Sequence, residues 1–142
     1  RSRLIYEIMI YLIHIIGFLL LLWFILIEIR RKRKPELYSH IPNETIYRLF
    51  LLLLGLTLAY FVGLQTWVYN PETKIKGIPF TVVVFEIAHE IADDYWMDHW
   101  GAISVVTFLG NMLFWVLAPQ ALFSIILKIK MDKREPTNPT PD

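Results

Sequence analysis

The sequence contains no cysteine, and this absence removes several classes of chemistry at once. Without a thiol there is no disulfide, no thiolate-bound metal and no c-type haem attachment. Charged residues are also scarce, at 19% of the 142 residues, and histidine occurs only four times. A soluble domain usually carries a larger charged share, so the composition argues against a soluble globular protein.

Motifs for nucleophilic or phosphate chemistry are missing as well. None of the serines lies in a nucleophile-elbow motif, and no glycine-rich phosphate loop occurs. His89 and Glu90 begin like a zinc-peptidase motif, but Asp93 stands where that motif requires its second histidine. The sequence identifies no reaction and favours a protein that is not an enzyme.

The sequence is rich in apolar residues, which make up 56% of the chain and form long segments. An α-helix needs about 20 apolar residues to cross a bilayer core. Three segments meet that need, at about residues 4–29, 46–68 and 101–127. We expect residues 1–134 to form a single membrane domain. The tail at 135–142 consists largely of Pro, Thr, Asn and Asp, and this composition predicts disorder.

The loop at 69–100 is too polar to cross a membrane, and its centre at 80–99 has a helical pattern. Apolar residues from Ile87 to Trp96 fall on one side of a helix, and acidic residues fall on the other. The pattern predicts an amphipathic helix at the membrane interface. The predicted fold class is therefore an all-α integral membrane protein with three transmembrane helices and one interfacial helix.

Basic residues predict the orientation. One run follows the first span directly, and it consists of Arg30, Arg31, Lys32, Arg33 and Lys34. A second basic group, at 128–134, ends the third span, and both belong on the cytoplasmic side. The N-terminus and the loop at 69–100 would then lie outside, as in a prokaryotic inner membrane. The run also suits anionic lipid headgroups, whereas the lack of accompanying aromatic residues argues against nucleic acid.

Small and polar residues mark two helix faces for packing. In the second span they recur every four residues, and in the third they form a polar seam. These candidate packing residues are Gly55, Ala59 and Gly63, together with Ser104, Thr107 and Asn111.

His14 lies near the middle of the first span. An ionisable group at that depth normally faces other protein or a cavity. We expect a neutral imidazole that is hydrogen-bonded to a neighbouring helix. The alternatives are a haem or chlorophyll ligand and a proton relay.

The expected interfacial helix brings carboxylates and an imidazole to one face. Spacings of three, four and seven residues let these side chains converge. They would suit a divalent metal, and the candidate ligands are Glu86, His89, Glu90 and Asp93. The other interpretation is a solvated acidic face that docks a basic partner.

Two short motifs flank this region. One is Gly-x-Pro-Phe at residues 77–80, and the other is Asn-x-Leu-Phe-Trp at residues 111–115. They resemble elements of small bacterial membrane proteins, and the resemblance implies no activity. Our main hypothesis is an accessory or assembly subunit of a larger membrane complex. The alternatives are a metal- or cation-handling protein and a pigment-binding or haem-binding subunit.

Overall fold

The structure is a computed structural model that describes residues 2–38 and 42–134. Helix α1 spans Ser2–Arg33 and is followed by the short 3-10 helix η1 at Pro35–Leu37 and by helix α2 at Glu44–Phe61. Four strands come next: β1 (Thr66–Asn70), β2 (Thr73–Lys76), β3 (Val83–Ile87) and β4 (Trp96–His99). Helix α3 spans Ala102–Arg134. The tail that we predict to be disordered lies outside the described residues.

The three α-helices are each long and apolar enough to cross a membrane, as the sequence predicts. The second is shorter than expected, because it ends at Phe61 and not near residue 68. At about 1.5 Å per residue, its 18 residues are about 27 Å long. After a short turn the chain enters β1, so the last residues of the expected span belong to the sheet.

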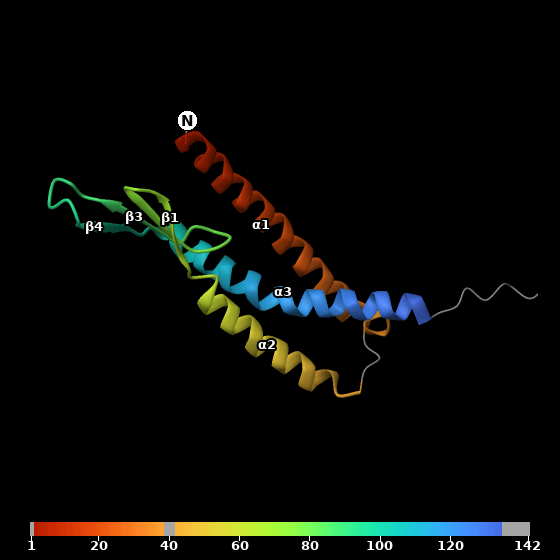
Figure 1. The fold of residues 1–142 in the computed structure, drawn as a ribbon. Coiled ribbons are helices and arrows are strands. Elements are labelled where there is room, and N and C mark those ends of the chain that lie inside the picture. The colour runs from red at the N-terminus through yellow and green to blue at the C-terminus, as the bar shows by residue number, and fades with distance from the viewer. Residues whose placement is uncertain (1, 39–41, 135–142) are drawn as a thin grey trace, which may run out of the picture.

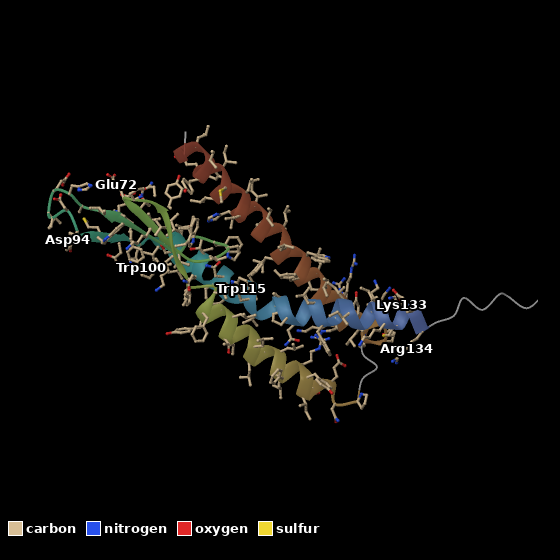
Figure 2. The ribbon with its side chains drawn as sticks, in the orientation of Figure 1. Glu72, Asp94, Trp100, Trp115, Lys133 and Arg134 are labelled. Atoms are coloured by element: carbon tan, nitrogen blue, oxygen red, sulfur yellow. The ribbon has the colours of Figure 1, made fainter. Side chains whose placement is uncertain are left out.

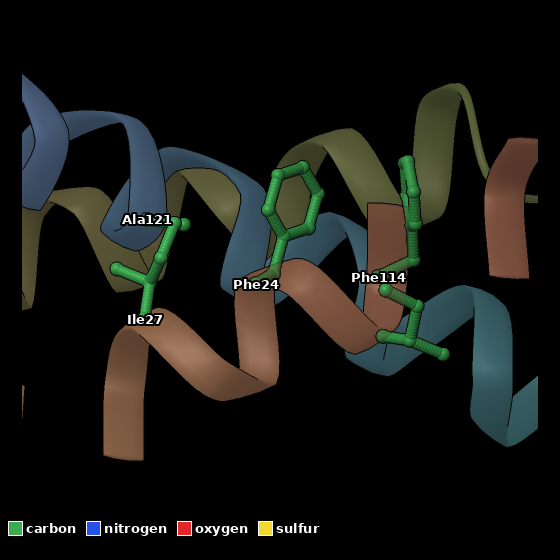
Figure 3. Packing of buried hydrophobic residues seen from close by; sticks show 5 residues of the cluster. Phe24, Ile27, Phe114 and Ala121 are labelled. Atoms are coloured by element: carbon green, nitrogen blue, oxygen red, sulfur yellow. The ribbon is translucent and has the colours of Figure 1, made fainter. Parts of the chain in front are cut away.

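Helix α3 is the centre of the bundle, and α1 and α2 each pack against it (Figure 1). The apolar core joins α1 to α3, and Figure 3 shows its packing. The ring centroids of Phe24 and Phe114 lie 5.4 Å apart, and Ala121 of the same core is fully buried near Ile27 (Figure 3). Most other large apolar side chains of the helices are exposed, as expected for surfaces that face lipid or other helices.

The prediction of an all-α fold is wrong, because residues 66–99 form a four-stranded antiparallel sheet. The strand order follows the chain, β1-β2-β3-β4. Ile75 of β2 pairs with Val84 of β3, and Phe85 of β3 pairs with Asp98 of β4. The sheet projects from the end of the bundle at which α2 ends and α3 begins (Figure 1).

The expected interfacial helix at 80–99 is therefore a β-hairpin. Residues 82–85 are valines and a phenylalanine, which favour strands, and β2 supplies a partner for them. The acidic residues at 90–94 lie in the turn, which is closed by a hydrogen bond of 2.8 Å from the Ala88 amide to the Tyr95 carbonyl. Over so short a segment, the periodic pattern does not separate a helix from two strands and their turn.

Gly55 sets the close approach of α2 to α3. A Cβ atom at this position would lie 2.8 Å from the Val116 Cα and 2.9 Å from the Trp115 carbonyl oxygen. Pro119 is one turn further along α3 and has no N–H, so it cannot donate to the Trp115 carbonyl. The glycine thus packs against backbone, which cannot move aside as a flexible side chain could.

We predict that Gly55→Ala destabilises the protein by about 1–3 kcal/mol, because the added methyl group forces the two backbones apart. Thermal unfolding in detergent measures the change. Gly101→Ala is the matched control, since nothing lies within 4 Å of a Cβ at that position. Equal melting temperatures for the two variants would contradict the close approach.

Candidate functional site

The junction between the sheet and the helices is the segment at residues 77–81, which we call the anchored loop. It connects β2 to the start of β3 and lies between α1 and α3. Gly77 has a φ of +116°, a conformation that L side chains rarely adopt, and the Ile78–Pro79 peptide bond is cis. An irregular segment in this position has backbone polar groups that cannot rely on water.

Asn111 of α3 binds both backbone groups of Phe80. Its side-chain oxygen accepts a hydrogen bond of 2.8 Å from the Phe80 amide, and its Nδ2 donates to the Phe80 carbonyl at 2.7 Å. Nδ2 also lies 3.4 Å from the carbonyl oxygen of Gly63. Asn111 is 1% exposed and Phe80 is half-buried, so the Asn111 side of these bonds is shielded from solvent. Asn111 therefore ties the anchored loop and the end of α2 to the central helix.

Three further side chains bind the backbone of the anchored loop. Trp115 Nε1 donates to the Ile78 carbonyl at 2.8 Å, and Trp67 Nε1 lies 3.4 Å from the Gly77 carbonyl. From α1, His14 Nε2 accepts a hydrogen bond of 3.0 Å from the Thr81 amide. The loop is thus held from two helices and from β1.

His14 uses both of its ring nitrogens within the chain. Nδ1 lies 2.8 Å from the Ile10 carbonyl and donates to it, so Nε2 carries the lone pair that accepts from Thr81. This is the neutral form that the sequence predicts, although the partner is a loop and not a neighbouring helix. A haem or chlorophyll metal could bind Nε2 only after Thr81 had been released. Pigment binding through His14 stays a prediction.

Two glycines make room for the apolar side chains of the anchored loop. A Cβ atom at Gly17 of α1 would lie 2.7 Å from Cγ of Pro79 and closer still to its Cβ. A Cβ at Gly110 of α3 would lie 3.2 Å from the ring of Phe80. The loop therefore fits between the two helices because both lack side chains where it enters.

The packing residues that the sequence suggests have different roles in the structure. Gly55 faces α3, and Ala59 is buried, with 1% exposure. Ser104 is buried and accepts a hydrogen bond from the Gly101 amide at the start of α3, while Thr107 donates to carbonyls of its own helix. Of Ser104, Thr107 and Asn111, only Asn111 hydrogen-bonds to the anchored loop and the end of α2 within the described residues.

The residues that the sequence suggests as metal ligands are not on one helical face, because the helix does not exist. Glu86 lies on β3, whereas His89, Glu90 and Asp93 lie in the turn between β3 and β4. Within residues 2–38 and 42–134, no group of three or more His, Asp or Glu side chains is placed to hold a metal ion. Metal binding by these residues stays a prediction.

Exposed pairs of histidine and carboxylate join neighbouring parts of the sheet. His89 lies 3.5 Å from a carboxylate oxygen of Glu72 and 3.5 Å from one of Asp93. His99 on β4 lies 3.5 Å from Glu86 on β3. Since these side chains are more than half exposed, each pair contributes little to stability, and the sheet presents an acidic, hydrated surface.

A second polar cluster lies toward the opposite end of the bundle, around Arg48 of α2. Its Nη1 donates to the carbonyl and side-chain oxygens of Gln120 at 3.1 and 3.0 Å, and its Nη2 donates to Ser124 at 2.9 Å. Gln120 returns a hydrogen bond of 2.9 Å to the Arg48 carbonyl. Arg48 therefore fixes the start of α2 to the second half of α3.

Glu28 brings α1 into the same cluster. Arg31 donates to Glu28 Oε2 at 2.8 Å, and Glu28 Oε1 lies 3.9 Å from Nη1 of Arg48. Oε1 is buried and has no hydrogen-bond donor in the part of the chain that the structure describes. The cluster thus links all three helices through charged groups, of which the sequence had pointed only to Arg31, as a member of the basic run.

Comparison with protein-family models, with curated proteins and with solved structures finds no match to this chain.

We predict that Asn111→Leu releases the anchored loop. The change removes the partners of two buried backbone groups, and an unsatisfied buried group costs about 1–3 kcal/mol. Hydrogen exchange by mass spectrometry in detergent should show at least about tenfold faster exchange at the Phe80 amide.

Thr57→Val is the matched control, because Thr57 is exposed and donates only to the Leu53 carbonyl of its own helix. It should leave exchange in residues 77–81 unchanged. Unaltered exchange in the Asn111 variant would show that the side chain does not hold the loop.

Proposed function

We propose that this chain is an accessory or assembly subunit of a larger membrane complex. Its helices would pack in the membrane with other subunits, and its sheet would contact a partner outside the cytoplasm. The observation that carries the proposal is the attachment of an acidic, water-exposed sheet to three membrane-type helices through the anchored loop. A sheet held in this way presents its surface in a defined direction.

The distribution of charge supports this orientation and a basic partner. Residues 69–100 contain six acidic residues and two lysines, and Nζ of Lys74 lies over the Trp96 ring at 4.3 Å. The basic residues cluster at the opposite end, where Figure 2 shows Lys133 and Arg134 far from Glu72 and Asp94. The positive-inside rule then places the basic end in the cytoplasm and the sheet outside the cell membrane.

Exposed apolar side chains accompany the acidic residues of the hairpin. Ile91, Tyr95, Met97 and Trp100 are between 41% and 64% exposed. Apolar groups of this size, bordered by charged ones, are typical of protein interaction surfaces. The helices also leave much surface for other subunits or lipid, since only 11–28% of each apolar window is buried within the chain.

Photo-crosslinking in native membranes tests the proposal. We expect a photoreactive amino acid at Tyr95 to give one discrete crosslinked product that contains a second polypeptide. Neutralising the turn with Glu90→Gln, Asp93→Asn and Asp94→Asn should lower its yield about tenfold, because charge complementarity favours association with a basic partner.

The matched control is Glu36→Gln with Asp132→Asn, which neutralises exposed acids at the basic end. It should leave the yield unchanged. A chain that migrates only as a monomer in mild detergent, with no product from Tyr95, would contradict the subunit role. A product that contains only a second copy of this chain would replace the partner with a homo-oligomer.

A further inference from the structure

The three helices line an open cleft of about 530 Å³ near the basic end of the bundle. All three helices contribute to its walls, and α1 and α2 face each other across it. Since α1 and α2 each pack mainly on α3, the space between them near the Arg48 cluster is left to be filled by something else. This cleft takes no part in the proposed contact of the sheet with a partner.

The lining of the cleft changes from charged to apolar along α2. Arg31 and Lys32 of α1 and Thr45 of α2 lie at the end where the basic run begins. Leu49 and Leu52 follow on α2, with Leu52 about 10 Å along the helix axis from Thr45. From α3, the walls are completed by Val116, Leu117 and Gln120. Leu49 and Leu52 are 57% and 37% exposed, so this part of the cleft is an open groove. A polar mouth beside an apolar groove of this length matches a headgroup and the first part of an acyl chain.

The charge at the mouth favours an anion. Each carboxylate of the cleft has a cation beside it, Glu28 with Arg31 at 2.8 Å and Glu44 with Arg48 at 3.3 Å. The second oxygen of Glu28, which has no hydrogen-bond donor among the described residues, lies 3.9 Å from Arg48. Lys32 has no ion-pair partner within residues 2–38 and 42–134. Its neighbours in the basic run are also cations, so a phosphate at the mouth would meet uncompensated positive charge.

We propose that this cleft binds one anionic glycerophospholipid. Its phosphate would lie at Lys32 and Thr45, and one acyl chain would run along Leu49 and Leu52. A bound lipid at this position fills the space between α1 and α2, which the chain itself leaves open. The site is distinct from general attraction of lipid to the basic run, because it needs the cleft as well as the charge.

Native mass spectrometry of the delipidated protein, titrated with phosphatidylglycerol, tests the site. We expect one tightly bound lipid per chain in the wild type, and binding of phosphatidylcholine at least about fivefold weaker. Lys32→Gln should weaken phosphatidylglycerol binding by a similar factor. Lys34→Gln is the matched control, because it removes the same charge from the same run but does not line the cleft.

A second pair of variants tests the apolar groove. Leu52→Trp places a bulky ring in the groove and should abolish the tightly bound lipid, whereas Leu53→Trp, at a position that is 63% exposed and outside the lining, should not. Melting temperatures in lipid-free detergent establish whether each variant is folded. Equal losses of phosphatidylglycerol binding from Lys32→Gln and Lys34→Gln would overturn the proposal. They would show that the charge of the basic run attracts the lipid without binding it in the cleft. Equal binding of phosphatidylcholine, or equal stabilisation by inorganic phosphate, would overturn it too.

Discussion

The arrangement of the whole chain depends on the hydrogen bonds that helix side chains form with the backbone of the anchored loop. Residues 77–81 lie between two apolar helices, where an unpaired amide or carbonyl is costly. Asn111 binds both backbone groups of Phe80, and the side chains of Trp115 and His14 bind Ile78 and Thr81. These side chains come from different helices, so the same bonds that satisfy the loop also fix the sheet relative to α1 and α3.

The helices could be predicted from the sequence, because apolar length is a local property. The sheet could not, because its stability comes from pairing between residues up to 15 positions apart, such as Val84 with His99. The acidic residues of the turn happen to have the spacing of one face of a helix, and this spacing led to the prediction of an amphipathic helix. The motifs at residues 77–80 and 111–115 can be recognised in the sequence. Their contact with each other cannot, because it joins residues that are far apart along the chain. The Arg48 cluster could have been suspected from the sequence, because its polar residues lie within segments that are otherwise apolar.

The molecule separates its two kinds of surface by position along the bundle. At one end the acidic hairpin, with exposed Tyr95 and Met97, faces water and suits a protein partner. At the other end Arg48 and Glu28 hold the three helices together around a cleft whose mouth is basic, which suits an anionic lipid. Between these ends, close packing at Gly17 and Gly55 leaves no room for side chains. The surface for a protein partner and the lipid site therefore lie at opposite ends of the helix bundle, and each can be present without the other.

The central claim is that side chains of the helices fix the sheet in one orientation. A spin-label distance measurement tests this most directly, and the lack of cysteine allows labels at two introduced cysteines only. With labels at the exposed positions Asp94 and Leu109, we expect one narrow distance distribution in lipid nanodiscs. Asn111→Leu should broaden it. A wild-type distribution as broad as that of the variant would show that the sheet moves freely on the helices and would contradict the account.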